Sequence, residues 1–86
     1  HKDVFVTRVE VKVANLRRLS GAEVCRILEA HGFVLVRQRG SHAILQRAVP
    51  GSTITVPVPL HKELKTGTLA SIIRQSQAPR SAFETR

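Results

Sequence analysis

The sequence predicts an α+β domain in which two helices pack on one face of a three-stranded antiparallel sheet. A capped amphipathic pattern begins at Ser20, three apolar or β-branched runs follow between residues 33 and 56, and a second helical stripe begins at Leu69. The order is therefore helix, strand, strand, strand, helix. Two helices on one side of such a sheet leave its other side open to solvent.

The first helix has a strong start signal. Ser20 and Glu23 have the spacing of a capping box, in which the Ser20 hydroxyl accepts from the Glu23 amide and the Glu23 carboxylate accepts from the Ser20 amide. Leu19 and Val24 stand at the two positions of a hydrophobic staple. Gly32 suits the left-handed residue that follows a helix, so we expect the helix to end at His31 and Gly32.

Three runs predict the strands: residues 33–36, 42–47 and 52–56. In the second run, Ala43 and Leu45 share one face and His42 belongs to the other. We expect the Ala43 and Leu45 face to lie on the core, so that His42 projects from the open side or the rim of the sheet. Pro57 and Pro59 cannot donate to a ladder and are expected to close the third strand.

A basic loop precedes the second helix. The segment Thr66-Gly67-Thr68 offers a cap for this helix, and Leu69, Ile72 and Ile73 share its apolar face. Pro79 is expected to end it. Phe83 lies in the short tail that follows, where it can dock back on the domain.

We divide the chain into an N-terminal extension (1–18), one domain (19–78) and a C-terminal tail (79–86), since 86 residues suit a single domain. In the extension, Val9 and Val11 alternate with charged residues, as in an edge strand. Three alternatives stay open for this segment: it adds to the sheet edge, it pairs between chains as a homo-oligomer contact, or it stays mobile.

Composition narrows the classes of partner. Fourteen Lys and Arg against six Asp and Glu give a net charge of +8, which favours a nucleic-acid partner, with an acidic protein as the alternative. Aromatic residues make up only 3%, so a stacking platform for single-stranded bases is excluded. We find no apolar run that could span a membrane and no signal peptide.

The single cysteine, Cys25, rules out an internal disulfide and is compatible with a reducing, cytoplasmic location. Its neighbours are apolar, so we interpret it as a small packed residue rather than a nucleophile. We see no cluster with metal-ligand spacing and no phosphate loop. The sequence therefore predicts neither a metal site nor a cofactor.

The short stretch from Arg37 to His42 concentrates the candidate chemistry. Gly40 allows a sharp turn between two strands, and Ser41 places a hydroxyl beside the imidazole of His42. Arg37 and Arg39 are guanidinium groups suited to phosphate. Because histidine has an ordinary pKa near neutrality, this stretch suits a site where an anionic polymer meets a proton-transfer group.

Cleaving RNA requires little more than such a site. The 2′-hydroxyl of the substrate is its own nucleophile, so a base for its proton and cations for the phosphorane suffice. His42 can supply the base. Lys62 and Lys65, which precede the second helix, are candidates for gripping the RNA backbone together with the helix amides.

Several motifs in register resemble the HicA (YcfA-like) toxin family: the run from Phe33 to His42, then Thr55-Val56-Pro57, then the run from Lys62 to Leu69 followed by Ile72. The resemblance extends over residues 19–76. It implies a fold like the double-stranded-RNA-binding domain. It also implies the toxin of a type II toxin–antitoxin system, an mRNA interferase that cleaves mRNA independently of the ribosome and without a known metal cofactor.

The same resemblance implies roles for residues and a partner. The catalytic histidine of the family's Gly-Ser-His motif falls on His42, and a HicB-family antitoxin is expected to cover the active site. Two features depart from the family pattern. The N-terminal extension is unusual, and Gln77 stands where a glycine commonly ends the second helix.

Three hypotheses follow for the function. The preferred one is an mRNA endoribonuclease with His42 as acid–base group and with Arg37, Arg39, Gly40, Ser41, Lys62 and Lys65 on the RNA. The second is a non-catalytic module that binds double-stranded RNA, although the start of the second helix, from Leu64 to Thr68, is a poor match to such domains. The third is a protein-interaction module whose basic face binds an acidic partner.

Overall fold

The computed structural model describes residues 18–84, which form two helices, three strands and a final 3₁₀ turn. The elements are α2 (Gly21–Ala30), β1 (Val34–Arg39), β2 (His42–Val49), β3 (Ser52–Pro59), α3 (Thr66–Ser76) and η1 (Arg80–Phe83). The predicted α-β-β-β-α order is confirmed. The proposed extension, apart from Arg18, lies outside the described residues, and so does the end of the tail.

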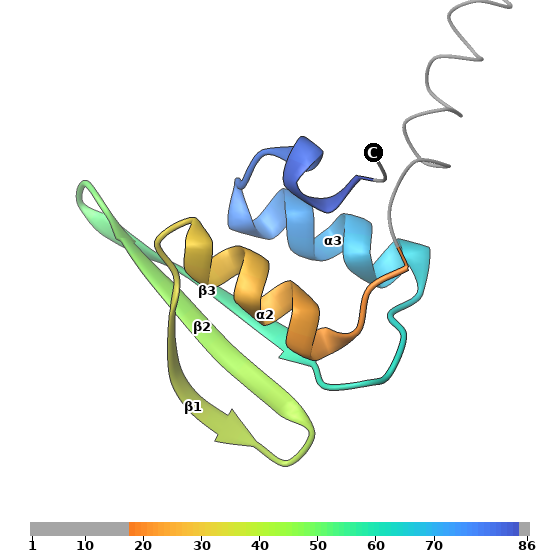
Figure 1. Ribbon diagram of the computed structural model, residues 1–86. Coiled ribbons are helices and arrows are strands. Elements are labelled where there is room, and N and C mark those ends of the chain that lie inside the picture. Colours follow the sequence, from red (N-terminus) through yellow and green to blue (C-terminus); the bar gives the residue numbers. More distant parts are fainter. Residues whose placement is uncertain (1–17, 85–86) are drawn as a thin grey trace, which may run out of the picture.

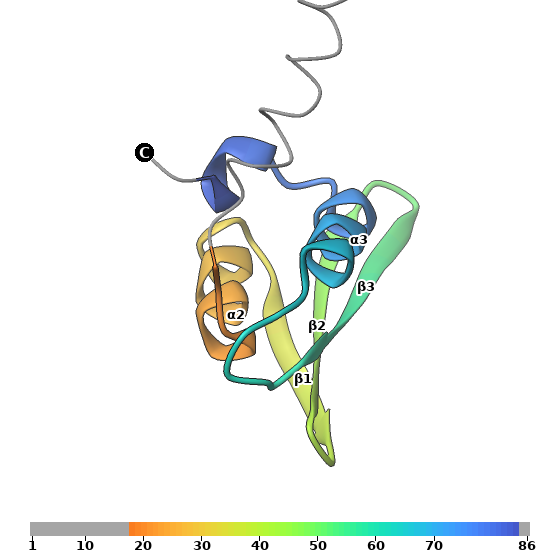
Figure 2. The same ribbon diagram turned by 90° about the vertical axis from the view of Figure 1, so that its right-hand side faces the viewer.

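The sheet is a simple meander in the order β1-β2-β3, and both pairs of neighbouring strands are antiparallel. The two helices lie beside each other against it, and the β1–β2 turn projects beyond them at the end of the domain opposite η1 (Figures 1 and 2). The turn therefore extends into solvent from the end of the sheet. None of the helices in the described part of the chain is long and apolar enough to cross a membrane.

The core lies between the helices and one face of the sheet. Alternate residues of β2 and β3 point into it, and Leu45, Val56 and Val58 are fully buried there. The helices contribute a complementary set: Val24, Leu28, Leu69, Ile72 and Ile73. The expected core face of Ala43 and Leu45 is confirmed, and His42 on the opposite face is exposed. Alternation along β2 thus places the histidine on the side that no helix covers.

The predicted capping box starts α2. The Glu23 amide donates to Ser20 Oγ at 3.1 Å, and the Ser20 amide donates to Glu23 Oε1 at 2.9 Å. Leu19 and Val24 are both buried in the core, as a hydrophobic staple requires. Gly32 has φ of +93°, which confirms it as the residue that turns the chain out of the helix.

The expected cap of α3 is wrong. The N-cap residue is Lys65, whose side chain makes no capping hydrogen bond, and the threonine at position 66 is already helical. The helix also ends at Ser76, before Pro79. Gln77 there adopts the left-handed conformation with φ of 59°, and its amide donates to the Ile73 carbonyl at 3.1 Å. A glutamine therefore does the work that a glycine commonly does at this position.

All three strands are longer than the sequence predicts, and β2 continues to Val49. β1 continues through Arg39, so the link to β2 consists of Gly40 and Ser41 alone. β3 continues past its expected end at Val56 as far as Pro59, and Pro57, which was expected to close it, pairs with Ile44. An edge strand tolerates proline where the missing amide hydrogen would point to solvent.

The tail returns to the domain. Phe83 is fully buried and belongs to the core cluster, so docking of this residue is confirmed. Arg80 and Glu84 form an ion pair across the turn, with Nε and Oε2 3.3 Å apart. The aromatic ring, rather than this pair, supplies most of the stabilisation, because burial of a large apolar side chain is worth about 1.5–3 kcal/mol.

Candidate functional site

The turn between β1 and β2 holds the two strands in tight register. Gly40 has φ of +58° and occupies the first central position of a two-residue turn, as a type II′ hairpin turn requires. Arg39 and His42 are the residues on either side, and they face each other across the ladder. Residues directly opposite in an antiparallel pair project from the same face. The guanidinium of Arg39 and the imidazole of His42 therefore leave the sheet together.

A β-bulge decides which face the arginines occupy. Leu35 pairs with Leu45, whereas the next pair joins Arg37 to Ile44, so Val36 is an extra residue in β1. In an unbroken register Arg37 would oppose Ala43 and point toward the helices. The extra residue shifts the register by one, and a shift of one residue exchanges the two faces. Arg37 and Arg39 consequently share the open face with His42.

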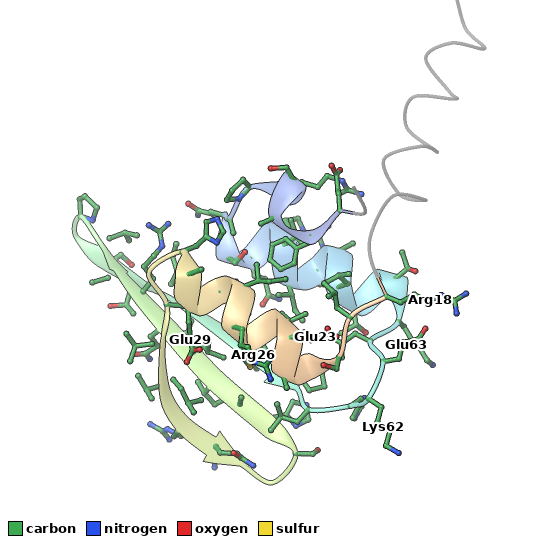
Figure 3. All side chains as sticks on the ribbon, viewed as in Figure 1. Arg18, Glu23, Arg26, Glu29, Lys62 and Glu63 are labelled. Carbon is green, nitrogen blue, oxygen red and sulfur yellow. The ribbon has the colours of Figure 1, made fainter. Side chains whose placement is uncertain are left out.

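The sheet carries no opposing charge. Residues 30–62 contain no Asp or Glu. The carboxylates of Glu23 and Glu29 come from α2, and that of Glu63 comes from the loop after β3 (Figure 3). Within the described residues, no hydrogen bond or ion pair engages the side chains of His42, Arg37 or Arg39. These groups are exposed and available to an anionic ligand.

The loop from Leu60 to Lys65 begins beside this hairpin. The Leu60 amide donates to the Ser41 carbonyl at 2.6 Å, so the end of β3 is tied to the β1–β2 turn. The Leu64 amide donates to the Leu19 carbonyl at 2.8 Å, which ties the other end of the loop to the start of α2. Lys62 projects outward between these two anchors (Figure 3).

Lys65 is less directly associated with the hairpin. It is exposed and forms the N-cap of α3, so its charge stands at the positive end of a helix whose first amides lack a side-chain cap. The structure thus brings Arg37, Arg39, Gly40, Ser41 and His42 together in one hairpin. It places Lys62 and Lys65 on the adjoining loop.

His31 and Cys25 lie elsewhere. The Nδ1 of His31 donates to the Ile27 carbonyl at 2.9 Å in the last turn of α2, which fits the expected role at a helix end. Cys25 is half-buried, and burial, aided by the nearby Glu29 carboxylate, raises the pKa of its thiol. A raised pKa disfavours the nucleophilic thiolate. Among the described residues, no group of three His, Cys, Asp or Glu side chains could hold a metal ion.

Arg47 has a role that we did not predict from the sequence. Its side chain packs on Gly32, and its guanidinium carbon lies 5.7 Å from the centroid of the Phe33 ring. It borders a pocket of about 160 Å³ that Ser76 and Gln77 also line. This pocket is five residues along β2 from His42, roughly 17 Å away. Arg47 is therefore a packing residue, separate from the cationic hairpin. Arg47 follows Leu45 by two residues in β2, so it lies on the same face as Ala43 and Leu45. This spacing was the sequence signal that could have predicted its packing.

Fold and hairpin together define a class of protein: a small basic α-β-β-β-α domain that presents an exposed histidine and two arginines on an uncovered sheet face. The family model described as the HicA toxin of bacterial toxin–antitoxin systems matches residues 21–78, which is more than half of the chain. The chain belongs to the HicA toxin family. Membership implies an antitoxin as partner. A search of curated proteins gives no significant match.

Proposed function

We propose that this chain is the toxin of a type II toxin–antitoxin system and acts as an mRNA interferase, cleaving mRNA with His42 as its acid–base group and without a metal ion. The observation that carries the proposal is the pairing of His42 with Arg39 across the ladder, on an exposed face where the strands and turns of the described sheet contribute no carboxylate. An RNA strand bound to this face would contact both members of the pair: the imidazole of His42 as a proton-transfer group and the guanidinium of Arg39 as a phosphate-binding group.

The reaction follows from these groups. The imidazole of His42 removes the proton from a 2′-hydroxyl, whose oxygen attacks the adjacent phosphorus. The bond from phosphorus to the 5′-oxygen breaks, that oxygen takes a proton from water, and His42 returns its proton to water. The products are a 2′,3′-cyclic phosphate and a 5′-hydroxyl. The guanidinium groups of Arg37 and Arg39 stabilise the charge that builds on the phosphorane oxygens. A positioned acid–base group contributes about 10²–10⁴-fold in rate.

The remaining candidates support binding of the RNA backbone. A Cβ built on Gly40 would meet nothing within 4 Å, so the turn leaves room for close approach of a phosphate. Ser41 is an exposed residue next to His42. Lys62 and Lys65 extend the positive surface along the loop toward the N-terminus of α3, where backbone amides favour anions.

The test is cleavage of a labelled transcript by purified His42→Ala protein in EDTA. We expect the unmodified chain to cut in EDTA and the variant to lose about 10²–10⁴-fold in rate. Because His42 is exposed, the circular dichroism spectrum and thermal midpoint should not change. His61→Ala is the matched control, since His61 is also an exposed histidine, and its rate under saturating protein should stay near that of the parent.

Two results would contradict the proposal. An undiminished rate in His42→Ala would remove the histidine from the chemistry. A transcript that is shifted in a gel but never cut by the unmodified chain would instead identify a non-catalytic module that binds double-stranded RNA.

A further inference from the structure

The outer edge of β1 is the most exposed apolar feature of the described residues. Val34, Leu35 and Val36 have exposed fractions of 62%, 47% and 45%. Consecutive strand residues point to opposite faces, so an open sheet face alone cannot expose all three. Leu35 is the clearest case. Its partner Leu45 is fully buried beneath the helices, so Leu35 also lies on the helix side of the sheet and is nevertheless exposed. β1 is one edge strand of the sheet, and α3 lies against the opposite edge strand, β3 (Figure 2).

The backbone of this edge also lacks a second strand partner among the described residues. Within residues 18–84, β1 pairs with β2 alone, and its other side has no ladder partner. Natural edge strands are usually protected by charges, proline or β-bulges. In β1 the charges stand only at Arg37 and Arg39, so the bulge at Val36 is the one such feature in the stretch from Val34 to Val36.

We infer that the outer edge of β1 is a docking surface for an extended, acidic segment of a protein partner, which adds to the sheet as a fourth strand. The main chain of such a segment would pair with β1, and its apolar side chains would cover Val34 and Leu35. Its carboxylates would face Arg37 and Arg39. Charge complementarity selects this occupant, because the chain carries +8.

Other occupants fit less well. A second copy would bring two chains of charge +8 together, which like-charge repulsion disfavours. RNA has no peptide backbone with which to extend a ladder, and three aliphatic side chains offer it no donor. A protein strand can pair with the free backbone edge of β1 and can also bury its apolar side chains.

This inference rests on the proposed function in one respect: the antitoxin implied by the family is the natural source of the segment. A strand bound at this edge would lie against Arg37 and Arg39, which share the open face with His42. Binding there would take the two cations away from an RNA phosphate, so docking and inhibition would be coupled.

The experiment measures binding of the purified cognate antitoxin to the full chain. We expect Leu35→Lys to weaken binding by about 10- to 100-fold, because a buried leucine contact is replaced by a charge. Thr53→Lys is the matched control, since Thr53 is exposed on β3, the opposite edge of the same sheet. It should bind as the unmodified chain does. RNA cleavage by Leu35→Lys in the absence of antitoxin should stay at the parent rate.

Hydrogen exchange of the unmodified chain gives a second measurement that needs no variant. Among residues 34–36, the amides that point away from β2 should exchange rapidly in the isolated chain and slowly in the complex, whereas amides bonded to β2 should be protected in both. Equal exchange of the outward amides in both states, unchanged affinity in Leu35→Lys, or failure of the antitoxin to bind would each overturn the inference. Slow exchange of the outward amides in the isolated chain would also overturn it, because the edge would then be occupied by a second copy or by residues 1–17. Cleavage of RNA is assayed separately, so loss of the docking surface and loss of the nuclease are distinguishable.

Discussion

Arg39 lies directly across the β1–β2 ladder from His42, on the face of the sheet that no helix covers. The relationship depends on two local features. The Gly40–Ser41 turn closes the hairpin without a further residue, and the bulge at Val36 turns the arginines away from the helices. Gln38 consequently pairs with Ala43 and lies on the helix side of β1.

Exchanging Gln38 and Arg39 tests whether the face matters. The double variant Gln38→Arg/Arg39→Gln keeps composition and net charge but moves the guanidinium to the other face. A charged hydrogen bond to phosphate is worth about 1.5–3 kcal/mol, so we expect RNA cleavage at subsaturating RNA to fall by about 10- to 100-fold. The single variant Arg39→Gln is the control and should lose a similar amount. Parent-level cleavage by the exchanged variant would show that net charge, rather than position, determines activity.

Gly21 is the point at which α2 approaches the end of β3. A Cβ built there would collide with the Pro59 carbonyl oxygen and lie 2.8 Å from the Leu60 Cα. Both obstacles are backbone atoms, which cannot turn aside. We expect Gly21→Ala to lower the free energy of unfolding by about 1–3 kcal/mol, as measured by urea denaturation.

Gly67 provides the matched control for this change. It also lies in the first turn of a helix, but its Cβ would meet nothing within 4 Å. Gly67→Ala should therefore raise the free energy of unfolding by about 0.4–1 kcal/mol, through a smaller loss of backbone entropy on folding. Equal effects of the two substitutions would contradict the close approach of α2 to β3.

The sequence predicted those features that depend on neighbouring residues. The capping box of Ser20 and Glu23, the left-handed Gly32 and the alternation that turns His42 away from Leu45 all follow from short spacings, and all are found. The family motifs also pointed to the correct order of elements. The placement of His42 on the open face was therefore predictable from local pattern.

Features that depend on long-range pairing were not predictable. Nothing in the run from Phe33 to Arg39 marks Val36 as an extra residue, because a bulge is defined only by the register with β2. The packing of Arg47 on Gly32 and Phe33 likewise joins segments far apart in the sequence. The predicted cap of α3 was wrong. Threonine is a favoured N-cap residue, but the N-cap of this helix is Lys65, whose side chain cannot accept a capping hydrogen bond.

Gln77 carries a backbone conformation that costs energy for a residue with a Cβ. Its φ of 59° lies in the left-handed region, where a residue with a Cβ is destabilised by about 1–2 kcal/mol. Substitution by glycine would remove this cost, but glycine loses more backbone entropy on folding, which offsets part of the stabilisation. We expect Gln77→Gly to raise the free energy of unfolding by about 0.5–1 kcal/mol. Gln77→Ala keeps the Cβ and should give no such increase in the same denaturation assay.

Lys62 offers a test of how far the RNA-binding surface extends from the hairpin. We expect Lys62→Gln, in the inactive His42→Ala background, to weaken RNA binding and to make it less sensitive to salt. Each phosphate contact to single-stranded RNA contributes about 0.7 to the slope of log K against log salt concentration. Loss of one contact should therefore lower the magnitude of the slope by about 0.7, measured by fluorescence anisotropy across a salt series.

Arg74→Gln removes the same charge from another part of the surface. Arg74 is exposed in the last turn of α3, next to the segment that borders the Arg47 pocket rather than the hairpin. Its substitution should leave the slope unchanged, because no phosphate is expected to lie there. If both variants lower the slope equally, the protein attracts RNA through its total charge. If only Lys62→Gln does so, the RNA follows the loop from Leu60 toward α3.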